Sequence, residues 1–169
     1  MNGLEVEPLQ PAAAPIDMLE HYFGVHGWAS ERNGDEEIVA TIDGSWTQYQ
    51  LRALWREEEG VLQLVALPDL QVPDDRRAAM WETLGRINEQ LWMGHFEMWS
   101  ADGTLLFRHA TALEADEDTG LSMAQAEIIV EAALDECERY FPVFQFVIFG
   151  GKSPTEAIAA ALIDTMGEA

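Results

Sequence analysis

The chain has 169 residues, of which 31 are acidic and nine are basic, so its formal net charge is -22. An apolar content of 48% indicates one folded domain with a core and argues against general disorder. The acidic excess argues against a basic groove for nucleic acid and against binding to an anionic membrane surface.

The first 14 residues are set apart by two prolines and a run of alanines. They carry two glutamates without a basic flank, which predicts a flexible leader rather than a signal peptide. Residues 15–169 are expected to form a single domain. No apolar run reaches the roughly 20 residues that span a bilayer. The single cysteine, Cys137, rules out an intramolecular disulfide and is typical of a cytoplasmic protein.

The first elements of the domain are a predicted helix and a short strand. Apolar residues recur at helical spacing from Ile16 to Phe23, and Pro15 suits the first turn of that helix. The polar residues 30–36 separate this helix from a strand predicted over residues 37–42.

Residues 45–67 alternate apolar and polar side chains, which predicts a β-hairpin with one buried face. With a turn near Gly60, Trp55 would lie opposite Leu64 and Ala53 opposite Ala66.

A helix is predicted from Asp74 to about Trp92. Its buried stripe consists of Met80, Leu84, Ile87 and Leu91. A second row, Trp81, Asn88 and Trp92, lies beside that stripe, so the helix is expected to pack on two sides.

A second hairpin is centred on the turn signal Asp102-Gly103. That turn pairs Trp99 with Leu106, Met98 with Phe107, Glu97 with Arg108 and Phe96 with His109. The opposite-charge pair and the shared apolar face support this register.

Two further helices follow an acidic loop at residues 114–120, which is read as solvated rather than as a calcium site. Ser122 with Gln125 predicts a capping box at the start of the first, and Pro142 is expected to kink or restart it. Gly150-Gly151 ends it, and a Ser-Pro-x-Glu start at Ser153 predicts the last helix. The fold class is therefore α+β, an antiparallel sheet of about five strands in the order α-β-β-β-α-β-β-α-α.

The strings "INEQLWMGHFEMW", "LLFRHA" and "LDECERYFPVFQFVIFGGKSPTEAIAAALIDTMGEA" resemble the YbjN-domain family of bacterial proteins, in the version common among alphaproteobacteria. The resemblance covers about Ile16 to the C-terminus and rests on long strings of unusual residues. It implies a fold like that of class I type III secretion chaperones and a dimer-prone, non-enzymatic domain. The family is described as chaperone-like or regulatory, and its molecular activity is not established.

No catalytic, cofactor or metal site is expected. Phosphate loops and nucleophile motifs are absent, and "FGGKS" lacks the earlier glycine of a Walker loop. His95 and His109 are predicted on opposite faces of their hairpin, so they cannot readily share a metal ion. Cys137 lies in the apolar row of a helix, which favours a buried, unreactive thiol.

The apolar stretch from Tyr140 to Phe149 has two interpretations. The preferred one is a core helix wedged between the sheet and the last helix, whose alanines allow close packing. The alternative is that some of these rings face a partner.

The leading functional hypothesis is a cytoplasmic, homodimeric, non-catalytic protein that binds another protein or an amphipathic peptide segment. The partner or dimer surface is predicted to contain Trp81, Trp92, Trp99 and Leu106, which lie off the core stripes. The alternative is a small-molecule sensor or enzyme with a pocket lined by Trp46, Tyr49 and Trp55. An acidic mimic of nucleic acid ranks last, because the carboxylates are scattered along the chain.

Overall fold

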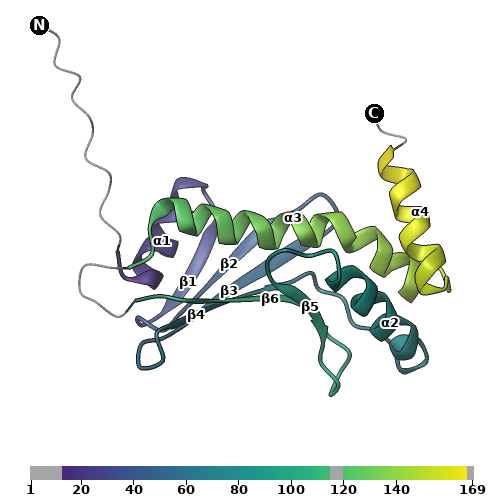
Figure 1. The fold of residues 1–169 in the computed structure, drawn as a ribbon. Coiled ribbons are helices and arrows are strands. Elements are labelled where there is room, and N and C mark those ends of the chain that lie inside the picture. The colour runs from purple at the N-terminus through teal and green to yellow at the C-terminus, as the bar shows by residue number, and fades with distance from the viewer. Residues whose placement is uncertain (1–12, 115–119, 167–169) are drawn as a thin grey trace, which may run out of the picture.

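The fold is an α+β arrangement around one six-stranded antiparallel sheet (Figure 1). The computed structural model describes residues 13–114 and 120–166. Residues 1–12 of the predicted leader and residues 115–119 of the acidic loop lie outside these described residues. In chain order the elements are α1 (Pro15–Val25), β1 (Ala29–Asn33), β2 (Glu37–Asp43), β3 (Gln48–Arg56), β4 (Val61–Leu67), η1 (Asp74–Arg76), α2 (Arg77–Asn88), β5 (His95–Met98), β6 (Leu105–Ala112), α3 (Met123–Ile148) and α4 (Pro154–Met166).

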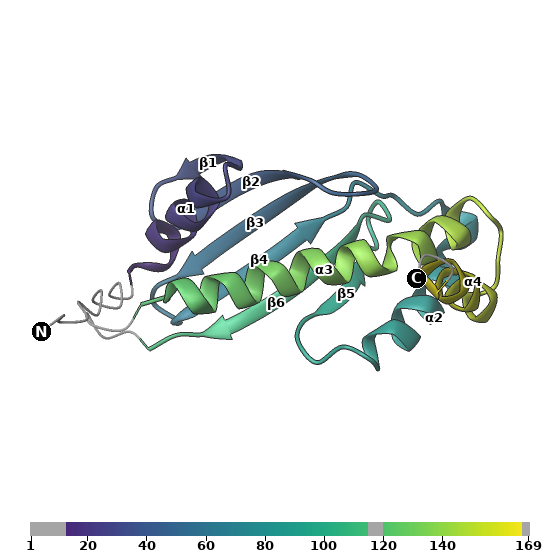
Figure 2. The same cartoon turned by 90° about the horizontal axis from the view of Figure 1, so that it is seen from above.

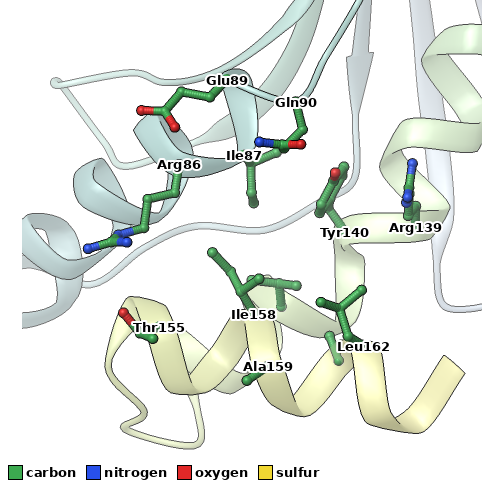
Figure 3. A pocket seen from close by; sticks show the side chains of 12 residues that line it. Arg86, Ile87, Glu89, Gln90, Arg139, Tyr140, Thr155, Ile158, Ala159 and Leu162 are labelled. Atoms are coloured by element: carbon green, nitrogen blue, oxygen red, sulfur yellow. The ribbon is translucent and has the colours of Figure 1, made fainter. Parts of the chain in front are cut away.

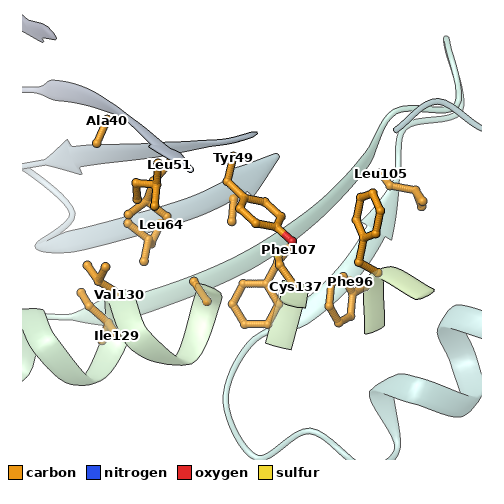
Figure 4. Packing of buried hydrophobic residues seen from close by; sticks show 14 of the residues in the cluster. Ala40, Tyr49, Leu51, Leu64, Phe96, Leu105, Phe107, Ile129, Val130 and Cys137 are labelled. Atoms are coloured by element: carbon orange, nitrogen blue, oxygen red, sulfur yellow. The ribbon is translucent and has the colours of Figure 1, made fainter. Parts of the chain in front are cut away.

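The strand order is β1-β2-β3-β4-β6-β5. Helices α1 and α3 lie over one face of the sheet, and α2 and α4 gather at one end of the molecule with the C-terminal part of α3 (Figures 1 and 2). The core fills the space between α3 and the sheet. Figure 4 shows it as a layer that includes Leu51, Leu64, Phe107, Ile129, Val130 and Cys137, all of which are buried.

Local capping signals set the starts of α3 and α4, as predicted. The Ser122 hydroxyl accepts a hydrogen bond from the backbone N–H of Gln125, and the Gln125 side chain accepts one from the backbone N–H of Ser122. Ser153 and Glu156 form the same reciprocal pair before α4. Because each pair satisfies N–H groups left unbonded at a helix start, three or four residues are enough to fix the boundary.

The sheet has six strands rather than about five, because β1 was not assigned from the sequence. Its side chains are almost all exposed, so its sequence shows no alternation of apolar and polar residues. It is an edge strand held by backbone pairing with β2, from Ala29 opposite Thr41 to Asn33 opposite Glu37. Arg32 adds a salt bridge to Asp17 of α1 at 2.6 Å.

The predicted register of the first hairpin was wrong by two residues. Ala53 lies opposite Leu64 and Trp55 opposite Leu62, rather than Ala66 and Leu64. A shift of two residues keeps the same face buried, so the apolar pattern is equally consistent with both registers.

The second hairpin shows the same two-residue difference. Phe96 pairs with Phe107 and Met98 with Leu105, because Trp99 and Thr104 close a four-residue loop in place of the predicted two-residue turn. The predicted partners Glu97 and Arg108 are diagonal neighbours here, and they still form a salt bridge of 2.8 Å.

Two helices differ in extent from the prediction. The segment from Asp74 begins with a 3-10 turn, and α2 ends at Asn88, so the half-buried Leu91 lies beyond it. Helix α3 is one helix of 26 residues with Pro142 inside it, so the proline does not restart it.

Candidate functional site

Three of the four predicted surface residues are exposed, and one is not. Trp81 on α2 is 49% exposed, Trp99 after β5 is 40% exposed, and Trp92 is fully exposed. Leu106 is fully buried, so its assignment to an exposed surface was wrong. Its strand is enclosed between β4 and β5, and the neighbouring Leu105 is hydrogen-bonded through its backbone to Leu70.

The end of the molecule formed by α2, the C-terminal part of α3, and α4 differs in charge from the rest. Residues 74–92 and 139–166 together hold six acidic and five basic side chains, whereas the rest of the chain holds 25 acidic and four basic ones. We call this the neutral end. The exposed Trp81 and Trp92, together with Phe149 and Leu162, lie in these segments. In a strongly acidic chain, a nearly neutral surface is the one that repels an acidic protein least.

Hydrogen bonds from Arg76 hold the neutral end together. Its guanidinium donates to the backbone carbonyls of Val147, at 2.7 Å, and Lys152, at 2.6 Å. Val147 lies in the last turn of α3, where the carbonyls have no helical partner and attract positive charge. Arg76 thereby fixes the start of α2 against the end of α3.

Asn88 fixes the other end of α2 to the sheet. Its side-chain amide donates to the backbone carbonyl of Phe96 and accepts from the backbone N–H of the same residue, at 3.1 and 2.8 Å. Asn88 was predicted to lie in the second row of the helix, beside Trp81 and Trp92. Its side chain bonds to β5 rather than to a partner protein.

A groove of about 740 Å³ lies between α2, α3 and α4 (Figure 3). It is called the helical groove below. Its lining residues are Arg86, Ile87, Glu89 and Gln90 from the end of α2, Arg139, Tyr140 and Val143 from α3, and Thr155, Ile158, Ala159, Ala161 and Leu162 from α4. Ile87 and Ile158 point toward each other across it, and the two arginines lie on opposite sides.

The two arginines of the helical groove have different neighbours. Arg86 forms a salt bridge to Glu82 at 3.0 Å. The Arg139 guanidinium carbon lies 5.5 Å from the centre of the Tyr140 ring, a cation–π geometry. Burial raises the pKa of Tyr140 above its ordinary value, with Arg139 opposing the rise and the Glu136 carboxylate adding to it. The phenol therefore stays protonated at neutral pH and can donate a hydrogen bond.

The aromatic residues of the alternative hypothesis do not line one pocket. Tyr49 is fully buried, and burial followed by the Glu138 charge raises its pKa. Trp46 is half exposed and stacks on Phe141, with ring centres 6.4 Å apart. Trp55 lines a separate cavity beside Arg56 and Glu59. Tyr49 and Trp55 lie on β3, and Trp46 lies in the turn before it. The three side chains are therefore spread along the sheet and do not meet in one pocket.

The apolar stretch from Tyr140 to Phe149 is largely core, as preferred from the sequence. Phe141, Val143, Phe144 and Val147 are buried, and α3 packs against both the sheet and α4. Phe149, the residue after α3, is 75% exposed. Tyr140 and Phe146 are half-buried, so Phe149 is the most exposed ring of the stretch.

The thiol and the histidines form no reactive cluster. Cys137 is buried, and burial, with added repulsion from Glu138 and Glu136, raises the pKa of its thiol. His95 contacts Glu97 at 2.6 Å and His109 contacts Thr111 at 2.8 Å, on opposite faces of the sheet. Over residues 13–114 and 120–166, no group of three or more potential metal ligands converges. The same part of the chain contains no helix long and apolar enough to cross a membrane.

A model of the YbjN family, described as "Putative bacterial sensory transduction regulator", matches residues 15–146. The chain belongs to the YbjN family. A solved structure, "Crystal structure of YbjN, a putative transcription regulator from E. coli", is similar with a TM-score of 0.55 and 10% sequence identity, over 76% of this chain and 90% of that chain. At this identity the likeness concerns the fold. The search of curated proteins found no match.

The match to the YbjN family ends at residue 146, before α4 (Pro154–Met166). The resemblance seen in the sequence runs farther, to the C-terminus. Because α4 supplies one wall of the helical groove, the groove depends on a part of the chain that the family model does not cover.

Sequence reasoning missed the helical groove and its residues Arg139, Tyr140, Ile158 and Leu162. One signal was present, since Ile158 and Leu162 are four residues apart and share a face of the last helix. That face carries large side chains, whereas Ala157 and Ala161 of the same helix are buried. The meeting of three helices from distant parts of the chain has no local signal.

Proposed function

We propose that this chain is a non-catalytic regulatory protein that acts by binding another protein through the neutral end. The observation that carries the proposal is the exposure of Trp81 and Trp92 in segments whose acidic and basic side chains nearly balance. Trp99, on the loop after β5, is a third exposed tryptophan. The family description as a sensory transduction regulator supports a regulatory role.

Exposed tryptophans are a strong reason to expect a protein interface. Tryptophan is enriched among the residues that contribute most to binding, because it buries a large apolar area and has a single N–H to satisfy. The acidic remainder of the chain disfavours acidic competitors and nucleic acid by repulsion. The partner that fits is therefore an amphipathic segment with apolar side chains facing Trp81 and Trp92.

The active form that we propose is a homodimer in the cytoplasm, with a chaperone-like or adaptor role. Exposed apolar area beyond that of the tryptophans, such as Phe149, supports self-association. The single buried cysteine supports a reducing compartment. We expect neither nucleic acid nor a membrane among its partners.

The test is affinity capture from native lysate with four immobilised proteins, followed by binding measurements with the purified partner. The proteins are the wild type, the double variant Trp81→Ala/Trp92→Ala, and the controls Val25→Ala and Ile128→Ala, which remove exposed apolar side chains elsewhere. The double variant is expected to capture no partner from the lysate. With the purified partner its Kd should be at least about thirty-fold higher, which corresponds to a loss of about 2 kcal/mol of binding free energy. The two controls are expected to bind like the wild type.

Equal capture by the wild type and the double variant would refute the proposed surface. Sedimentation of the same proteins tests the dimer separately. A monomeric wild type at micromolar concentration would contradict the dimer and leave the binding result standing.

A further inference from the structure

The helical groove has an apolar wall on one side and hydrogen-bond donors on the other. Ile158 and Leu162 of α4 face the groove opposite Ile87 of α2 (Figure 3). The Gln90 amide and the Tyr140 hydroxyl lie on the side away from α4, with Arg139 next to them. A molecule that fills this space would meet apolar side chains along its body and polar groups at one end.

The size of the helical groove favours a small molecule. Its volume of about 740 Å³ lies within the range of about 300–1,000 Å³ that small-molecule sites occupy. A ten-residue helix, about 10 Å across and about 15 Å long, displaces more than about 1,000 Å³. Such a helix would lie partly outside the groove.

Three charged side chains line the groove, the basic Arg86 and Arg139 and the acidic Glu89, so the basic ones are in excess and favour an anion. Of the nine basic residues, six form salt bridges to carboxylates among the described residues: Arg32, Arg52, Arg56, Arg77, Arg86 and Arg108. Arg139 is not one of them. Its guanidinium lies over the ring of Tyr140 and also acts electrostatically on the Glu136 carboxyl group. A guanidinium can bind a carboxylate through two parallel hydrogen bonds, and Tyr140 can donate a third.

We propose that the helical groove binds an amphipathic carboxylate of the fatty-acid class, with its chain along α4 and its carboxylate on Arg139. The site is separate from the tryptophans of the proposed partner surface, so either proposal can fail while the other stands. A bound ligand would contact α2, α3 and α4 together. It would therefore link the helices that form the neutral end, which suits a protein that senses a small molecule.

The test is a fluorescence titration of the full chain with 11-(dansylamino)undecanoic acid, followed by displacement with three ten-carbon competitors. These are decanoate, decan-1-ol and decylamine, all used below their aggregation concentrations. The expected result is saturable probe binding and displacement by decanoate at concentrations at least about tenfold lower than by the alcohol or the amine. Decanoate is expected to displace the probe best because its carboxylate forms a charge-assisted hydrogen-bonded pair with Arg139.

Three variants locate the site. Arg139→Gln is expected to weaken decanoate at least about tenfold and to leave decan-1-ol unchanged. Ala159→Phe, at an exposed position of α4 that lines the groove, is expected to weaken both by filling the space. Arg52→Gln removes an arginine on the opposite face of the sheet and is expected to change neither. Circular dichroism and urea midpoints establish that each variant is folded.

Four results would overturn the proposal. They are no probe binding up to millimolar concentration, equal displacement by decanoate and decylamine, decanoate binding unaffected by Arg139→Gln, and binding unaffected by Ala159→Phe. Displacement of the probe by an acidic amphipathic peptide but not by decanoate would also overturn it, in favour of a protein ligand.

Discussion

Trp46 donates its indole N–H to the backbone carbonyl of Glu138, with the two atoms 3.1 Å apart. This carbonyl is the one that residue 142 would bond to in a regular α-helix, and Pro142 has no N–H. The turn between β2 and β3 thus supplies the donor that the proline removes from α3. The backbone N–H of Ser45 adds a hydrogen bond of 2.8 Å to the Glu138 carboxylate. A residue predicted to line a pocket instead binds the helix that contains the proline.

This relationship predicts that Trp46 and Pro142 are energetically coupled. Trp46→Phe keeps the ring stacked on Phe141 but removes the donor, and we expect a loss of about 0.5–1.5 kcal/mol of unfolding free energy. Pro142→Ala restores a helical N–H for the Glu138 carbonyl. In that background Trp46→Phe should cost less, by about 0.5–1 kcal/mol, in a double-mutant cycle measured by urea unfolding. Additive effects of the two substitutions would contradict the assignment.

Gly44 is predicted to be required for the same turn. A side chain at this position would overlap the Glu138 carboxylate and the Tyr49 ring. We expect Gly44→Ala to lower the unfolding free energy by about 1–3 kcal/mol, because the neighbours would have to move. The matched control is Gly85→Ala in α2, where nothing lies within 4 Å, and which should stabilise by up to about 1 kcal/mol. Destabilisation of equal size at both positions would contradict the overlap at Gly44.

The sequence predicted elements whose signals are local. The capping boxes at Ser122 and Ser153 and the buried stripe of α2 each depend on residues within one or two turns. Hairpin register was missed by two residues in both hairpins, because alternation fixes the face and leaves registers that differ by two equivalent. The edge strand β1 was missed because backbone pairing, without apolar side chains, holds it in place.

The candidate site was predicted only in part. Trp81 and Trp92 could be placed at the surface because they lie beside the stripe of α2. Leu106 was misplaced, since alternation shows which face a side chain takes and not whether neighbouring chain covers that face. The helical groove joins residues about 70 positions apart, such as Ile87 and Ile158, and no local pattern records such a meeting.

Glu136 is predicted to make stability depend on pH. Burial raises its carboxyl pKa, Asp135 adds to the rise, and Arg139 opposes it; one carboxylate oxygen is buried without a hydrogen-bond partner among the described residues. A folded-state pKa above the unfolded value means that this residue stabilises the fold at low pH. The stabilisation is lost as pH rises through the folded pKa. Glu136→Gln should therefore be more stable than the wild type at pH 7, with a smaller difference at pH 4.

Urea unfolding of both proteins between pH 4 and pH 8 measures this difference. Glu131→Gln, an exposed position on the same helix, controls for the removal of one negative charge from an acidic chain. The prediction is contradicted if the increase in unfolding free energy caused by Glu136→Gln does not change with pH. It is also contradicted if that increase equals the one caused by Glu131→Gln.

The central claim is that the neutral end meets another polypeptide, and site-specific photo-crosslinking in cells tests it most directly. A benzoylphenylalanine is placed at Ala78, exposed on α2 three residues before Trp81, and in a second protein at Ile128, exposed near the start of α3. We predict a discrete adduct with another chain from position 78 and none from position 128. Adducts from position 128 alone, or from neither position, would contradict the account.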